Sequence, residues 1–84
     1  MGLPNQPITL TVGQLDDLNR KLAHLRHDIN NNLSLMLAAL ELIRHKPQVA
    51  ERMLVTLGEQ PPKVIASLNK FSAEFEQALG ITRP

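Results

Sequence analysis

The feature that most constrains the fold is a repeat of apolar residues at three- and four-residue steps in the first half of the chain. The repeat consists of Leu15, Leu18, Leu22, Leu25, Ile29, Leu33, Met36, Leu40 and Ile43. Apolar residues at this spacing line one face of an α-helix. The sequence therefore predicts a first helix of about 35 residues, a rod of roughly 50 Å at 1.5 Å per residue.

Local signals define where this helix begins and ends. Residues 1–10 contain two prolines and a glycine and are expected to form an extended lead-in. Thr11 and Gln14 match a capping box, with apolar residues on both sides of it. Pro47 disfavours helical geometry in the preceding residue, so we expect the helix to end near residues 45–46.

A second helix is predicted to follow, with Pro47 in its first turn. Its apolar positions are Ala50, Leu54, Leu57, Pro61, Val64, Leu68, Phe71, Phe75 and Ala78. Two prolines at 61 and 62 normally break or kink a helix, but the spacing keeps its phase across them. We expect one continuous helix kinked at Pro61-Pro62, with a break into two helices as the alternative. Gly80 is a stop signal, and residues 81–84 form a tail.

The predicted fold is all-α: a long two-helix antiparallel hairpin formed by residues 11–80. Between Leu33 and Ile43 the first helix is apolar almost all round, so it needs neighbours on several sides. A single hairpin cannot supply them, whereas two hairpins packed as a four-helix bundle can. We therefore expect a homodimer.

Composition excludes several classes of function. Eighty-four residues make one small domain, and with no cysteine it has neither disulfides nor thiolate metal ligands. A net charge of +1 without Trp or Tyr argues against nucleic-acid binding. No apolar run reaches the roughly 18–20 residues of a membrane span, and no secretory signal opens the chain. We expect a cytoplasmic protein.

A polar cluster interrupts the first helix, where His27 and Asp28 are followed by three asparagines at 30–32. The cluster lies on two consecutive four-residue steps of the repeat, a stutter that changes supercoiling locally. With Leu25 and Ile29 facing the second helix, His27 is predicted to face solvent and Asn31 to lie one turn further on. Neutral imidazole beside a carboxylate is a workable nucleophile toward a phosphoryl group.

The segment "HDINNNLSLMLAALELI" resembles the H-box of the dimerisation and histidine-phosphotransfer domains of two-component sensor histidine kinases. His27, Asp28, Asn31 and Leu33 match its pattern of His, acid, Asn or Thr, and Leu. "LRHDINNNL" also resembles the phosphotransferase of sporulation phosphorelays. The resemblance implies that His27 accepts the phosphoryl group, that Asp28 assists as acid or base, and that Asn31 positions water or a partner side chain. One departure is Asn32, where the family often has the proline that kinks the helix.

The same resemblance implies the partners. No ATP-binding domain or glycine-rich lid motif is present in this chain, so ATP and magnesium are expected on partner domains and no cofactor on the chain itself. The phosphoryl group would pass between a kinase ATP-binding domain, in cis or in trans, and the aspartate of a response-regulator receiver domain. Whether the chain is free-standing or part of a kinase stays open.

Other interpretations compete with this one. A non-catalytic dimerisation or adaptor module explains the hairpin but not the His-Asp-x-x-Asn grouping. An enzyme acting alone is disfavoured, because the sequence has no pocket-forming loop and no glycine-rich phosphate cradle. A metal site from His24, His27 and Asp28 is a weaker alternative. Asn30 and Asn32 are expected to be solvated.

Overall fold

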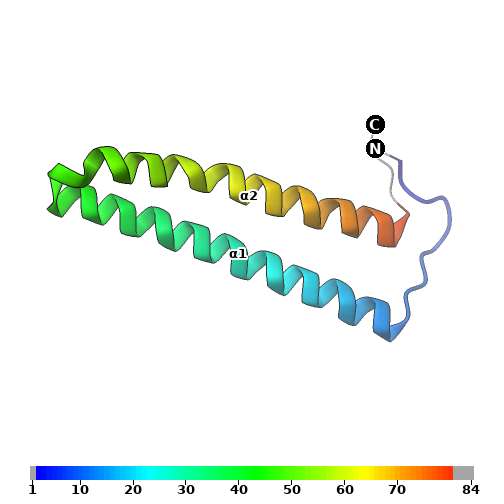
Figure 1. The fold of residues 1–84 in the computed structure, drawn as a ribbon. Helices are drawn as coiled ribbons and strands as arrows, with labels where there is room; N and C mark the ends of the chain where they lie inside the picture. The colour runs from blue at the N-terminus through cyan, green and yellow to red at the C-terminus, as the bar shows by residue number, and fades with distance from the viewer. Residues whose placement is uncertain (1, 81–84) are drawn as a thin grey trace.

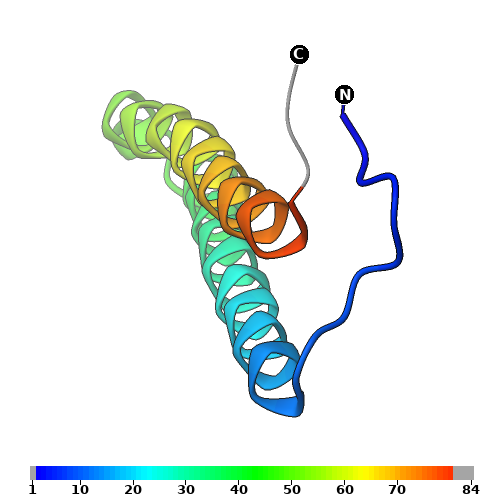
Figure 2. The ribbon, with the colours of Figure 1, turned by 90° about the vertical axis from the view of Figure 1, so that its right-hand side faces the viewer.

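The computed structural model describes residues 2–80 and consists of two long antiparallel helices joined by one short turn (Figure 1). Helix α1 spans Val12–His45, the 3-10 turn η1 spans Pro47–Val49, and α2 spans Ala50–Leu79. The helices lie closest together near η1 and diverge toward the other end, here called the open end (Figures 1 and 2). The predicted all-α antiparallel hairpin is confirmed.

The predicted ends of the first helix are also confirmed. The backbone amide of Gln14 donates to Oγ1 of Thr11 at 3.1 Å, and the Thr11 amide donates to Oε1 of Gln14 at 2.8 Å, which completes the capping box. This reciprocal pair satisfies two backbone donors at the start of α1. At the far end the Lys46 amide donates to the Leu42 carbonyl at 2.7 Å.

Helix α2 continues through Pro61 and Pro62 without a break, so the predicted single helix is confirmed and the two-helix alternative is wrong. Without their own amide hydrogens, the two prolines cannot donate to the carbonyls of Leu57 and Gly58. Both prolines are exposed, so their rings do not disturb the packing against α1. The kink stays a prediction. Gly80 ends the helix with φ of 69°, a left-handed conformation that glycine adopts without strain, and the predicted tail lies outside the described residues.

The residues that α1 turns toward α2 repeat every seven positions without interruption. The least exposed series is Leu18, Leu25, Asn32 and Ala39, flanked by Ile29, Met36 and Ile43. Leu33 and Leu40 are 46% and 45% exposed, so they point away from α2. The expected stutter at the polar cluster is therefore wrong: the seven-residue spacing runs through Asn32, which turns inward in place of Leu33. We call the inward-facing residues of both helices the seam.

The predicted face of the second helix is half correct. Ala50, Leu57, Val64 and Phe71 are shielded as expected. The other positions of the seam are Met53, Gln60, Ser67 and Glu74, each one residue before the predicted Leu54, Pro61, Leu68 and Phe75, which are exposed. The apolar pattern was wide enough to fit two orientations of the helix. The hydrogen bond between Gln60 and Asn32 belongs to the orientation that the structure adopts.

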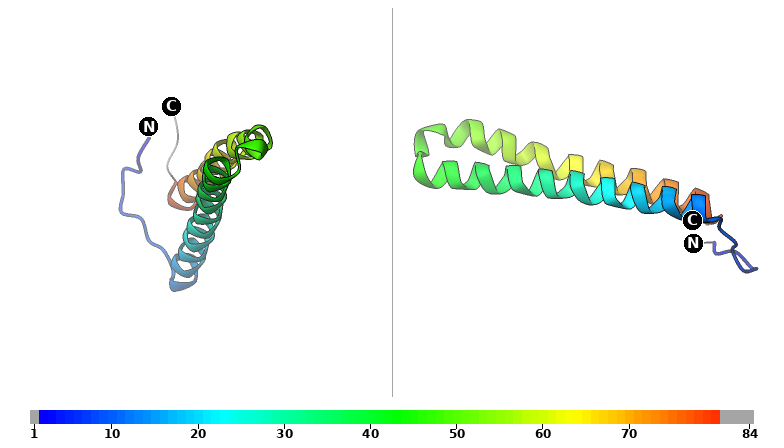
Figure 3. Two further views of the ribbon diagram at one scale, coloured as in Figure 1. Left: turned by 90° about the vertical axis from the view of Figure 1, so that its left-hand side faces the viewer. Right: turned by 90° about the horizontal axis from the view of Figure 1, so that it is seen from below.

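The hairpin is elongated and has little core. It measures 59 × 28 × 12 Å, as the further views in Figure 3 illustrate, and its radius of gyration is 18.1 Å. A compact domain of this length would have a radius of gyration of about 12 Å. Ala39 is the one buried apolar side chain among the described residues. None of the helices in residues 2–80 is long and apolar enough to cross a membrane.

Candidate functional site

His27 and Asn31 lie on the exposed surface of α1, near the middle of the helix. His27 follows the seam residue Leu25 by two positions, which turns its side chain about 160° from the seam at 3.6 residues per turn. No hydrogen bond or ion pair within residues 2–80 involves its imidazole ring. The ring is therefore available to a partner molecule, and its role as phosphoacceptor stays a prediction.

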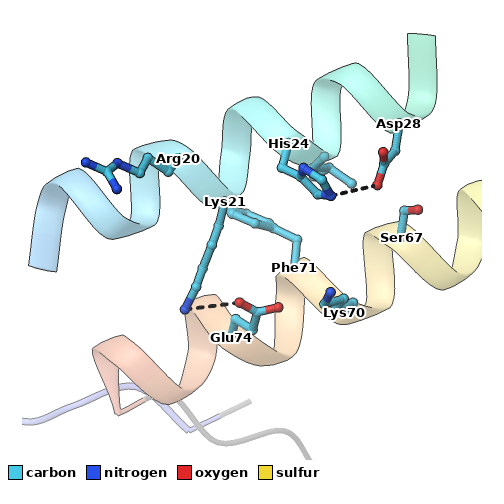
Figure 4. A pocket seen from close by; sticks show the side chains of 9 residues that line it. Arg20, Lys21, His24, Asp28, Ser67, Lys70, Phe71 and Glu74 are labelled. Atoms are coloured by element: carbon cyan, nitrogen blue, oxygen red, sulfur yellow. Dashed lines mark ion pairs between the residues drawn. The ribbon is translucent and has the colours of Figure 1, made fainter. Parts of the chain in front are cut away.

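Asp28 turns toward the opposite helix rather than toward His27. Its side chain is 38% exposed, and Oδ2 lies 3.5 Å from Nε2 of His24, four residues earlier on α1 (Figure 4). Neighbouring residues on a helix diverge by about 100°, whereas residues four apart share a face. The structure therefore joins Asp28 to His24 and leaves His27 outside this pair.

A groove of about 400 Å³ lies between the helices toward the open end, on the side that carries His24 and Asp28. Leu25 and Phe71 form part of its apolar lining. Its polar lining comes from Arg20, Lys21, His24 and Asp28 on α1 and from Ser67, Lys70 and Glu74 on α2 (Figure 4). The divergence of the helices opens this groove beside the predicted site, a feature that the helical repeat alone does not reveal.

Lys21 links the two walls of the groove. Its Nζ lies 3.0 Å from the Glu74 carboxylate on α2 and 3.0 Å from that of Asp17 on α1. The hydrogen bond to Asp17, followed by the one to Glu74, raises the pKa of Lys21 above its ordinary value of 10.5. Both interactions favour the charged amine.

A buried polar layer lies next to the predicted site and was missed by the sequence analysis. Nδ2 of Asn32 donates to Oε1 of Gln60 at 2.8 Å, and Nε2 of Gln60 donates to the Thr56 carbonyl at 3.1 Å. Asn32 is 8% exposed and Gln60 2%, so the expectation that Asn32 is solvated is wrong. Its carboxamide is buried because Gln60 supplies a matching acceptor in the opposite helix. The available signal was the seven-residue spacing from Leu18 and Leu25 to this asparagine.

The alternative metal site is not formed. Within residues 2–80 no group of three or more His, Asp or Glu side chains is placed to hold a metal ion. His24 and Asp28 share the groove side of α1, while His27 lies further round the helix. Two side chains in one pair do not provide the three or four ligands of a protein zinc site.

Comparisons with known proteins found no relative of this chain. No protein-family model, curated protein or solved structure matches the chain. The arguments about function below therefore rest on the residues and the geometry of the hairpin.

Proposed function

We propose that the chain is a histidine phosphotransfer module of two-component signal transduction, with His27 as phosphoacceptor. The observation that carries the proposal is the exposure of His27 at the middle of a long helix, without a hydrogen bond or ion pair to any described residue. In that position a separate domain can bring a phosphoryl group to the ring from solvent. The H-box resemblance of residues 27–33 supports the same assignment.

The chemistry is a displacement at phosphorus. One ring nitrogen of neutral His27 forms a bond to phosphorus as the bond to the leaving oxygen breaks, on ATP in a kinase domain or on the aspartyl phosphate of a receiver. The proton on the other ring nitrogen is then lost to a base, the role we propose for Asp28. Asn31, one turn further on, is proposed to position water or a partner side chain. ATP and magnesium would come with the partner domains.

We further propose that two hairpins form a four-helix bundle. Residues that lie one or four positions after a seam residue point to one side of the hairpin. Because the helices are antiparallel, this side is the same for both helices, and it lies opposite the groove. This side, here called the apolar face, contains Leu22, Leu33, Leu40, Leu54, Ile65, Leu68 and Phe75, which are 38–58% exposed. A second copy of the same face would cover it in a twofold symmetric dimer.

The exposed area agrees with such a dimer. The chain exposes 6481 Å², whereas a compact monomer of 9.4 kDa exposes about 5,000 Å². The excess, to which the extended lead-in contributes, is larger than the roughly 800 Å² per chain of a standard interface.

A non-catalytic dimerisation module is the second candidate, and one contact favours it. Asp28 is paired with His24 instead of His27, so the acid expected to assist the reaction is engaged elsewhere. In this alternative the apolar face is the functional surface, and the exposed His27, Asn30 and Asn31 serve solubility.

Phosphoryl transfer from receivers distinguishes the two candidates. We would mix the chain with several phosphorylated receiver domains and magnesium, and follow its intact mass at neutral pH. An acid-labile phosphoryl adduct on the wild type, absent from His27→Gln, is expected. His45→Gln is the control, because His45 is also exposed but is the last residue of α1, far from the polar cluster. No adduct from any receiver would favour the dimerisation module.

The dimer is tested separately by sedimentation. Leu40→Glu places a charge on the apolar face and is expected to lower the dimer fraction at equal protein concentration. Ser34→Glu, an exposed position on the same helix outside that face, is the control. A monomeric wild type with an intact helical signal would contradict the bundle.

A further inference from the structure

We propose that His24 is a positioning residue that holds the Asp28 carboxylate at the groove and thereby keeps it from His27. The inference rests on the proposed function, since it concerns the base of that reaction. Nothing in the H-box pattern includes this histidine. It follows from the one ion pair that Asp28 makes within residues 2–80, with Nε2 of His24 at 3.5 Å.

The position of His24 on the helix allows it to compete with His27. It precedes Asp28 by four residues and His27 by three, so both are its neighbours on the surface of α1. Asp28 and His27 are adjacent in sequence and point about 100° apart. To take the proton of the His27 ring, the carboxylate has to leave the groove side and give up His24.

The exposure of the pair sets the size of the effect. The His24 side chain is 72% exposed and that of Asp28 is 38% exposed. Ion pairs this close to solvent are weak, so removing His24 is expected to accelerate phosphorylation of His27 by about two- to fivefold. A large change would not fit a restraint of this kind.

Phosphoramidate tests the restraint without any partner protein. The His27 ring nitrogen attacks its phosphorus as the P–N bond breaks, the protonated amine leaves as ammonia, and the proton on the other ring nitrogen passes to Asp28. We would measure the rate of phosphorylation at His27 in the full chain by peptide mass. The variants are His24→Ala, His24→Gln, Asp28→Asn and the double variant His24→Ala/Asp28→Asn.

The expected pattern depends on Asp28. His24→Ala is faster at His27, while His24→Gln stays near the wild-type rate because its amide can donate a hydrogen bond to the carboxylate from the same position. The gain disappears when Asp28 is also replaced. His45→Ala, which removes the corresponding pair with Glu41 at 3.1 Å, leaves the rate at His27 unchanged.

Lys70 lines the groove from α2 and could take the place of His24. His24→Ala/Lys70→Met removes both side chains. The proposal is overturned when neither this variant nor His24→Ala is faster than the wild type, or when the gain persists with Asp28→Asn.

The phosphoramidate rates also separate this inference from the proposed function. If the variants react with phosphoramidate in the expected pattern but no receiver transfers a phosphoryl group to the chain, the role of His24 is supported and the relay function is not. If receivers transfer phosphoryl groups to the chain at a rate that does not change when His24 is replaced, the relay function is supported and the restraint by His24 is not.

Discussion

Two polar contacts between α1 and α2 can be compared within residues 2–80, and they differ mainly in their access to water. Asn32 and Gln60 meet at 2.8 Å in the middle of the seam, where they are 8% and 2% exposed. Lys21 and Glu74 meet at 3.0 Å near the open end, with side chains 39% and 27% exposed. The first link is neutral and buried, and the second is charged and partly exposed to solvent.

The comparison indicates that burial, rather than charge, decides how much a polar contact contributes. Water replaces the partners of Lys21 and Glu74 when their contact is lost, and such pairs contribute little to stability. Water cannot reach the Gln60 carboxamide, so losing its partner leaves an unsatisfied buried acceptor. We therefore expect the neutral layer to matter more for the hairpin than the ion pair.

The largest effect is expected from Asn32→Ala. The variant leaves Oε1 of Gln60 buried without its donor, and it should lower the free energy of unfolding by about 1–3 kcal/mol. Urea denaturation followed by helical circular dichroism measures this, at one protein concentration for all variants because dimerisation would add to stability.

Asn30→Ala is the matched control for that experiment. It makes the same substitution two residues away at an exposed site, where alanine is the better helix former by roughly 0.5–0.7 kcal/mol. The control should be as stable as the wild type or slightly more so. Equal losses in the two variants would contradict the importance of the buried layer.

Replacing both members of the layer should have a smaller effect. In Asn32→Leu/Gln60→Leu no buried polar group is left unpaired, and apolar replacement of both partners is often nearly neutral or stabilising. We expect a free energy of unfolding within about 1 kcal/mol of the wild type, or above it. A loss as large as that of Asn32→Ala would mean that packing volume, rather than hydrogen bonding, governs this layer.

The elements of the fold could be predicted because their signals are local. Thr11 and Gln14 are three residues apart, and the apolar repeat of α1 is readable in one pass along the chain. Asn32 could not be placed correctly from its residue type, because polar residues are usually exposed. Its burial depends on Gln60, which is distant in sequence and lies in the other helix.

The candidate site shows the same division. The orientation of His27 follows from helical geometry and from Leu25 alone. The partner of Asp28 cannot be predicted in this way, because both His24 and His27 are close enough in sequence to compete for the carboxylate. The choice depends on the side-chain conformation of Asp28 beside the groove, and the groove itself forms only when α2 packs against α1.

A smaller effect is expected from Lys21→Met, which removes the charged link. The melting temperature should fall by less than in Asn32→Ala, and the difference from wild type should shrink as salt is added, because exposed charges are screened. The loss in Asn32→Ala should not depend on salt. Arg20→Met is the control, since the Arg20 pair with Asp16 lies within α1. A deficit in Lys21→Met that persists at 1 M salt would indicate a packing role for the lysine stem.

The smallest effect concerns pH and acts on the same link. The folded state raises the pKa of Lys21 above 10.5, so folding favours the protonated amine. The resulting stabilisation is fully present below the unfolded pKa and is lost as pH rises through the raised folded value. Melting curves of the wild type and Lys21→Met should therefore differ at pH 8 to 9 and converge as the pH rises past the pKa of folded Lys21, which lies above 10.5. The difference between wild type and Asn32→Ala should not change over that range, because neither amide titrates. If only the curves of the wild type and Lys21→Met converge, the contribution of the charged link is distinguished from that of the neutral one. A difference between wild type and Lys21→Met that stays constant with pH would show that the charge of Lys21 contributes nothing to the stability of the hairpin.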